Sequence, residues 1–463
     1  INGKKVVAIK EKAFFGRDKV TSVTIPESVT DIGTQAFCGC KAKKINIPKG
    51  IKILKEKVFC NSGIESISIP SSVVTIESEA LAYTPIKNIK IPSSVTTIKD
   101  EAFEATELVE FSLPGTVKNV GKGILKFCEK LKKIQFPGGI KEIPEGFVCG
   151  CSNLETIPIP GSVKRIGADA FGGTGIEKIR LPEKLEEIGE STFSGCTNLK
   201  SIVLPGTLKK LGAEAFAYCE SLSEVSIPGS VEKIFEETFE NCTSLKKVVF
   251  EDGVRYVEAD AFRGCEGNIR EMHMTDSLMD IENPGKFENC TFYGFSETKI
   301  EDACIAFGFP FVSVGTNVLK APKFKAAAKS GNCVQIHRDG YVPGADFYEY
   351  AISKDKNFPK TGKVLYQTEG DEECIFEVLD KGVYYVFARA YQDREWWYQV
   401  HDKRVYSDWS APVKVQITQT LKPCKIQKVT VKGNTVTVTV NSVPGAEGYG
   451  IVLSDQKTAA RNF

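Results

Sequence analysis

The stretch LKSIVLPGTLKKLGAEAFAYC, from Leu199 to Cys219, decides the fold because its pattern recurs along the first two thirds of the chain. Its proline returns every 22 or 23 residues, and ten copies stand at Pro26, Pro48, Pro70, Pro92, Pro114, Pro137, Pro160, Pro182, Pro205 and Pro228. Glu251 takes the place of the proline in an eleventh copy. A fixed period of this length indicates a stack of similar units.

Apolar residues keep fixed distances from each proline. In the quoted copy, Ile202 and Leu204 precede the proline with the spacing of a short strand, and Leu208, Leu211 and Phe216 follow it. One such coil cannot cover its own apolar side, whereas stacked coils can. About twelve coils at about 4.8 Å each predict a solenoid of roughly 60 Å. We expect a parallel β-sheet on one face and short strands, turns and helical turns on the other.

The pattern resembles that of the BspA-like leucine-rich repeats over residues 5–314. The segment at 291–315 also resembles the closing unit of that family, and the helical spacing from Thr298 to Phe307 would shield the last coil. We therefore predict a leucine-rich-repeat solenoid over residues 1–315, with a cap at about 291–315. The resemblance implies a bacterial cell-surface protein that adheres to host proteins, to other cells or to matrix.

The period stops at residue 316, and short alternating apolar runs follow it. The segments GVYYVFARAY and YSDWSAP resemble the late strands of a fibronectin type III domain, with Tyr384 as the corner tyrosine. We therefore predict an all-β fibronectin type III-like sandwich over residues 316–419. Because VPGADFYEYAISKD at Val342 returns as VPGAEGYGIVLSDQ at Val443, residues 420–463 are predicted to begin a second, incomplete module. We favour a chain cut from a longer protein over a partial sheet packed on its neighbour.

Composition and motifs disfavour several classes of function. Sixty basic and 59 acidic residues give a net charge of +1, so we expect no nucleic-acid partner. No apolar stretch approaches the length of a membrane span, so we expect no direct membrane insertion. The three histidines lack metal-ligand spacing and no catalytic motif is present, so we predict no enzyme activity, no cofactor and no metal site. The chain starts at Ile1 without an export leader, and we expect a signal and an anchor outside it and an extracellular, cell-surface location.

The cysteines follow the repeat rather than a site. Several stand three residues after the buried phenylalanine position, as Cys196 and Cys219 do. Coil-to-coil spacing lies within disulfide reach, but parallel side chains point the same way and a free cysteine is a good small apolar residue. We expect buried thiols rather than disulfides or zinc ligands.

The outward face of the predicted sheet is the first candidate binding surface. It comprises the residues two and four before each proline or its replacement, from Ser22 and Thr24 to Lys247 and Val249, and we call it the sheet strip. Six of its 22 residues are basic and two are acidic, which favours an acidic ligand. The candidate contacts are Lys133, Lys178 and Arg180. The absence of aromatic residues among these positions favours a merely solvated face instead.

A second candidate surface lies in the C-terminal third. Trp396, Trp397 and Tyr398 are consecutive, so strand alternation cannot bury all three on one side. Projecting aromatic residues suit a sugar or protein ligand, and packing between domains is the alternative. We therefore predict a binding protein for a host or microbial surface protein, for matrix or for a glycan. Carbohydrate attachment, or the non-catalytic part of a larger secreted hydrolase, is the alternative function.

Overall fold

The computed structural model describes residues 5–258, 260–275, 277–278, 280–281, 287, 289–296, 298–316, 318–329, 333–370, 373–376, 380–393, 404–418, 426–432 and 435–440. The chain divides into two compact units, Ile1–Thr316 and Asn317–Phe463. Each unit is described by itself.

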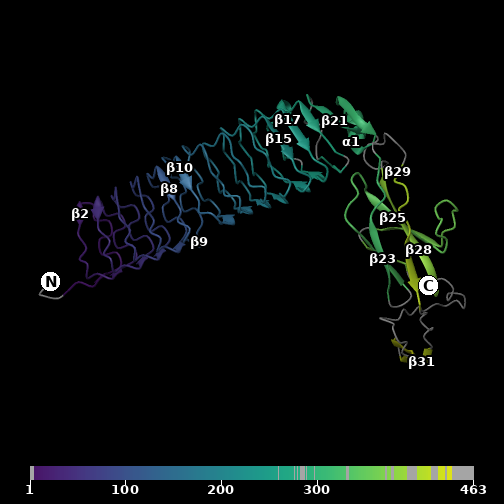
Figure 1. The fold of residues 1–463 in the computed structure, drawn as a ribbon, viewed down its shortest axis with the longest axis horizontal. Helices are drawn as coiled ribbons and strands as arrows, with labels where there is room; N and C mark the ends of the chain where they lie inside the picture. The colour runs from purple at the N-terminus through teal and green to yellow at the C-terminus, as the bar shows by residue number, and fades with distance from the viewer. Residues whose placement is uncertain are drawn as a thin grey trace. The chain divides into compact units, whose positions relative to one another are not determined.

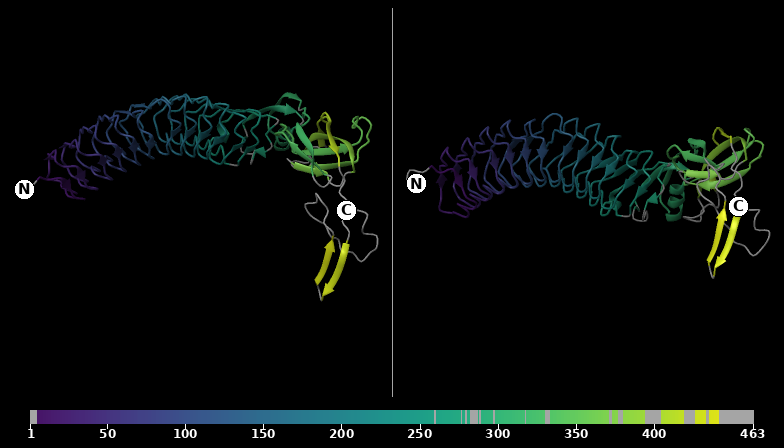
Figure 2. Two further views of the ribbon diagram at one scale, coloured as in Figure 1. Left: turned by 60° about the horizontal axis from the view of Figure 1, so that its bottom comes forward. Right: turned by 90° about the horizontal axis from the view of Figure 1, so that it is seen from below.

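The first unit is a stack of coils in which consecutive repeats are neighbours in space, so the predicted solenoid is confirmed (Figures 1 and 2). One side of it, the ladder side, carries a two-residue strand from every coil. Among the described residues these are β1 (Ala8–Ile9), β3 (Asp31–Ile32), β5 (Ile53–Leu54), β6 (Thr75–Ile76), β7 (Thr97–Ile98), β9 (Asn119–Val120), β11 (Glu142–Ile143), β12 (Arg165–Ile166), β13 (Glu187–Ile188), β14 (Lys210–Leu211), β16 (Lys233–Ile234), β18 (Tyr256–Val257) and β20 (Asp280–Ile281). They pair in parallel in the four groups β1–β3, β5–β9, β11–β14 and β16–β20.

The second side, the sheet side, carries the strands that precede the prolines, and Figure 1 shows β8 and β10 opposite β9. These strands are β2 (Ser22–Val23), β4 (Lys44–Ile45), β8 (Glu110–Ser112), β10 (Lys133–Gln135), β15 (Glu224–Ile227), β17 (Lys247–Phe250), β19 (Glu271–His273), β21 (Thr291–Ser296) and β22 (Phe311–Thr316). The last five form one parallel sheet in this order. Pro158 stands in the coil after β10, where it cannot donate a ladder hydrogen bond, and no named strand forms there.

The third side, the turn side, lies around the buried phenylalanine of each coil. The main-chain amides of Gln35, Phe37 and Gly39 donate to carbonyl groups of the following coil at 3.1, 2.9 and 2.9 Å. Gln35 and Gly39 have φ angles of 55° and 68°, so left-handed residues alternate with Phe37 and its equivalents. This side differs from the helical turns expected, because alternate amides leave the coil instead of bonding along it.

Aromatic rings form the core between the three sides. Phe193, Phe216, Phe239 and Phe262 are buried, and successive ring centroids lie 5.2, 5.4 and 5.3 Å apart with interplanar angles of 7° or less. Each ring therefore fills the space between those of the adjacent coils, which is how the stack buries apolar surface that one coil cannot.

The turn cysteines are buried free thiols that bond to the main chain. Cys196 Sγ donates to the carbonyl oxygen of Phe171 in the preceding coil at 3.2 Å, and Cys219 and Cys242 repeat this contact one and two coils later. In a short turn, Thr174 occupies the equivalent position and its hydroxyl donates to the same Phe171 oxygen at 2.8 Å. The main-chain amide of Thr174 also donates to this oxygen, at 3.2 Å, so the small donor side chains add further hydrogen bonds to a buried carbonyl group.

The C-terminal end of the solenoid carries α1 (Lys299–Phe307). Thr298 caps its first turn, since the Thr298 hydroxyl accepts from the amide of Glu301 at 3.4 Å, and Gly308 ends the helix in the left-handed conformation. Ile300 and Cys304 are buried in the solenoid core. The helix thus covers the last coil, as an end unit has to do. A 3₁₀ turn, η1 (Glu266–Asn268), precedes β19.

The second unit consists of antiparallel strands. One sheet contains β23 (Phe324–Lys329), β24 (Cys333–Arg338) and β27 (Glu373–Phe376), and the other contains β25 (Phe347–Ser353), β26 (Tyr366–Gly370), β28 (Gly382–Asp393), β29 (Arg404–Tyr406) and β30 (Val413–Ile417). Ile336 from the first sheet and Tyr350, Val386 and Val415 from the second share one apolar core. A separate hairpin joins β31 (Ile426–Lys432) to β32 (Thr435–Val440). The fibronectin type III identity stays a prediction.

Candidate functional site

The sheet strip lies at the surface, with Lys133, Lys178 and Arg180 exposed. Lys133 Nζ lies 3.6 Å from a carboxylate oxygen of Glu110 in the neighbouring coil, so its charge is partly balanced. Lys178 and Arg180, two residues apart on one coil, make no ion pair within the described part of the chain. The structure thus brings Lys178 and Arg180 together as a free cationic pair and leaves Lys133 apart from them.

An exposed apolar residue adjoins this pair. The parallel bridge between Lys178 and Ser201 sets the register of two coils and places Val203 beside Arg180. Val203 is 81% exposed, the highest value among the large apolar residues described. It belongs to the sheet strip, and its exposure is fixed by strand alternation because Ile202 and Leu204 on either side are buried.

The strip continues beyond the eleven coils read from the sequence. The sheet register aligns Val249 with His273, His273 with Tyr293, and Tyr293 with Val312. The rings of His273 and Tyr293 stack with centroids 4.6 Å apart and an interplanar angle of 7°. Sequence analysis missed this pair because the spacing changes to 24 and then 20 residues and no proline marks these strands. The alternation of EMHM and TFYGF is the signal that identifies them.

An open groove of about 930 Å³ lies on the ladder side between β9 and β11. Within residues 5–258, no main-chain hydrogen bond joins these two strands. In the adjacent coils the amides of Gly121 and Gly167 donate to the preceding coil, but the equivalent residue here is Pro144, which has no amide hydrogen. Lys118 and Lys141 on its lips have no ion-pair partner within that range. The groove therefore carries exposed lysines on the side of the solenoid remote from the sheet strip.

The buried thiols are poor candidates for reactive groups. Desolvation raises the pKa of Cys128 and of Cys196 to about 11, although hydrogen bonds from Thr106 and Thr174 oppose the effect. The thiolate is the nucleophilic form, so these side chains are unreactive near neutral pH.

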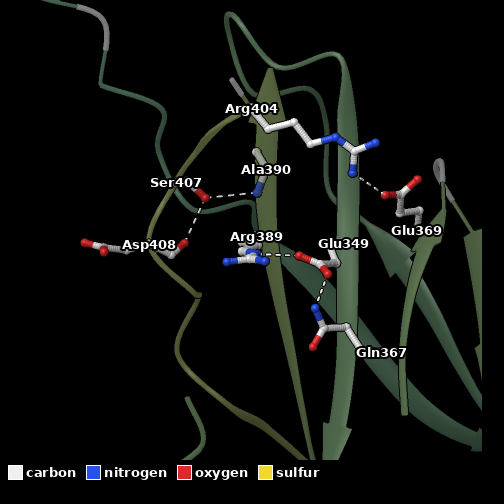
Figure 3. A network of polar contacts seen from close by, with 8 residues as sticks. All are labelled: Glu349, Gln367, Glu369, Arg389, Ala390, Arg404, Ser407 and Asp408. Carbon is white, nitrogen blue, oxygen red and sulfur yellow. Dashed lines mark hydrogen bonds and ion pairs between the residues drawn. The ribbon is translucent and has the colours of Figure 1, made fainter. Parts of the chain in front are cut away.

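In the second unit, Trp396, Trp397 and Tyr398 lie outside the described residues. They belong to the connection between β28 and β29, and the structure describes both of these strands. Arg404 at the start of β29 donates to a carboxylate oxygen of Glu369 at 2.9 Å (Figure 3).

A second arginine on the same sheet is enclosed by aromatic rings. The guanidinium carbon of Arg389 lies 4.0 Å from the ring centroid of Tyr406 and 4.6 Å from that of Trp409. Its Nε is 2.5 Å from a Glu349 carboxylate oxygen, and the other oxygen of this carboxylate accepts from the side-chain amide of Gln367 (Figure 3). Arg389 and Glu349 are mostly buried and paired with each other, so they join β28 to β25 and offer no free charge to a ligand.

The described residues also bear on metal binding and on membrane spanning. Among the described residues, no cluster of three or more histidine, cysteine, aspartate or glutamate side chains is arranged to hold a metal ion. The only α-helix described, α1, has nine residues, and no described helix reaches the length and apolarity of a membrane span.

Comparisons with known proteins concern the solenoid. The family model described as "BspA type Leucine rich repeat region" matches six copies over residues 3–106, 74–184 and 164–293. No curated protein matches the chain. Among solved structures, a leucine-rich repeat protein from Bacteroides ovatus is 24% identical over 63% of this chain and 88% of its own, with a TM-score of 0.35. The pneumococcal vaccine antigen PcpA is 22% identical over 66% and 84%, with a TM-score of 0.49. A leucine rich cell surface protein from Faecalibacterium prausnitzii is 26% identical over 53% and 83%, with a TM-score of 0.36.

Proposed function

Because this chain belongs to the BspA type leucine-rich repeat family, we propose that it is a non-catalytic binding protein of the bacterial cell surface. Its solenoid attaches to an acidic ligand on a host or microbial surface protein or in the matrix. The observation that supports this most directly is the free cationic pair, Lys178 and Arg180, on a regular exposed strip. Stacked coils form an extended surface of this kind, on which many weak contacts add up.

The second unit serves as a fibronectin type III-like spacer or as a further binding module in this proposal. The contact that supports the assignment is the hydroxyl of Tyr384, which donates to the main-chain carbonyl of Asp380, four residues upstream, at 2.7 Å. A corner tyrosine of such a domain makes this bond.

The test measures binding of the full chain to an array of matrix proteins, acidic glycosaminoglycans and neutral glycans at low and at physiological salt. The double variant Lys178→Glu and Arg180→Glu is expected to weaken binding at least about tenfold, because repulsion replaces attraction at the contact. The matched control is Lys118→Glu with Lys141→Glu, which changes the net charge equally on the ladder side. Lys133→Glu is expected to have a smaller effect, since Glu110 already balances Lys133.

Binding that is unchanged by the Lys178 and Arg180 reversals at low salt would contradict the proposal. Equal losses in the ladder-side control would mean that net charge, rather than the sheet strip, determines binding. Binding confined to neutral glycans would favour carbohydrate attachment as the function instead.

A further inference from the structure

Exposed apolar side chains are aligned on the C-terminal half of the sheet side. Val203, Val249, His273, Tyr293 and Val312 lie at the same position of their coils on the strip, and we call them the apolar row; the exposed Ser226 of the coil between them separates Val203 from Val249. Val203 and Val312 are 81% and 42% exposed, and the other three are half-buried. Single exposed valines are ordinary on a protein surface, but a register-aligned series with a stacked aromatic pair is typical of a contact surface.

The apolar row rests on rigid backbone. Its last four members belong to β17, β19, β21 and β22, which are paired in one continuous parallel sheet. The stacking of His273 on Tyr293 fixes both rings, and His273 Nε2 lies 3.5 Å from a Glu271 carboxylate oxygen. Because this surface is already ordered, binding of a partner costs conformational entropy mainly in the partner.

The charges beside the apolar row are distributed unequally. Next to its centre, Lys247 Nζ and a Glu271 oxygen lie 3.6 Å apart and balance each other. At its N-terminal end, Lys178 and Arg180 have no such partner within the described residues. The coil between Val203 and Val249 carries the exposed polar residues Glu224 and Ser226. The surface therefore offers apolar contact on either side of this coil and free positive charge at its N-terminal end.

From this arrangement we infer that the partner is a protein segment with exposed apolar side chains and an acidic residue at one end, which binds with that residue at Lys178 and Arg180. This inference rests on the proposed function and names the class of its ligand. A polyanionic glycan needs cations along its whole length, whereas among the described residues of the apolar row and its flanks the free cations are Lys178 and Arg180 at the N-terminal end. Aromatic rings and an arginine beside aliphatic residues are the usual anchors of protein contacts.

The experiment selects random phage-displayed peptides on the immobilised full chain and measures the affinity of the winning synthetic peptides. We expect peptides that combine apolar residues with aspartate or glutamate. Val203→Ser is expected to weaken them about tenfold by removing one apolar contact. Because Val203 is 81% exposed, this change leaves the fold intact. The matched control is Val74→Ser, at a 40% exposed valine that is not in the sheet strip, with an expected change below about twofold.

The charge arm uses Lys178→Gln with Arg180→Gln, which is expected to remove the preference for acidic peptides. One outcome overturns the inference and leaves the proposed function standing. In it, the selected peptides bind the Val203→Ser variant as tightly as the native chain but no longer bind the Lys178→Gln, Arg180→Gln variant. If neither variant changes the affinity of the selected peptides, both the inference and the proposed function are overturned. A selection that enriches no peptide overturns the protein-segment class, and the array then decides the function separately. A concentration-dependent dimer in sedimentation velocity that Val203→Ser abolishes also overturns the inference, since a second copy is then the occupant.

Discussion

Truncation of Phe216 to alanine tests whether the stack of rings holds the solenoid together. Phe216 is fully buried, and its ring lies between those of Phe193 at 5.2 Å and Phe239 at 5.4 Å. Loss of a buried phenylalanine side chain costs about 3–5 kcal/mol through lost transfer energy and the cavity left behind. Two aromatic contacts, each worth about 0.5–1.5 kcal/mol, place the expected cost in the upper part of that range.

The matched comparison is Phe14→Ala at the first coil. Phe14 is half-buried and stacks on a single described ring, that of Phe37, at 4.9 Å. We therefore expect about half the cost of Phe216→Ala. Urea titration followed by circular dichroism gives the global free energy of unfolding, and hydrogen exchange locates the loss along the stack, since coils of a repeat protein open separately. A cost below about 1 kcal/mol at Phe216, or equal costs at both positions, would refute the reasoning that neighbouring coils bury each ring.

Three further predictions concern other contacts. Gly150→Ala is expected to destabilise the solenoid by about 1–3 kcal/mol in thermal melts, because φ is 75° and a Cβ would lie 2.3 Å from the Phe127 ring. Adding Phe127→Ala should recover part of this loss, and no recovery would show that the clash is unimportant. Cys196 is expected to resist iodoacetamide at pH 8 until urea unfolds the chain. Because folding raises its pKa from 9.0 to about 11, the folded state retains the proton longer, and the free energy of unfolding should fall as the pH rises from 9.0 to about 11. Rapid labelling of Cys196 in the native chain would contradict its burial. Arg389→Ala is expected to destabilise the second unit by about 1–3 kcal/mol, since Glu349 is left mostly buried without its cation; unchanged hydrogen exchange in β25 and β28 would show that the pair contributes little.

The solenoid could be predicted because each coil obeys the same local rule. A proline ends the strand before it, and apolar residues such as Leu208 and Phe216 recur at fixed distances, so one copy predicts the environment of the others. The outward direction of Lys178 and Arg180 also follows from strand alternation. These properties depend on spacing alone, which the sequence records directly.

Properties that depend on exact backbone geometry could not be predicted. The left-handed turns place residues such as Tyr83 and Phe127 at positive φ, although their sequence does not require it. The stack of His273 on Tyr293 arises where the period changes to 24 and 20 residues, so the proline register does not reach it. Whether a charge is free also depends on side chains of other coils, as the different surroundings of Lys133 and Lys178 show.

The turn side has a consequence for the length and the ends of the solenoid. On this side, alternate amides of each coil donate to alternate carbonyl groups of the next coil, so the dipoles of these peptide groups add in one direction. Whole coils can be inserted or removed without disturbing this polarity, but the two ends cannot be exchanged. On the turn side, an additional coil at the N-terminal end would have to bring amide donors, because the first coil presents carbonyl oxygens there.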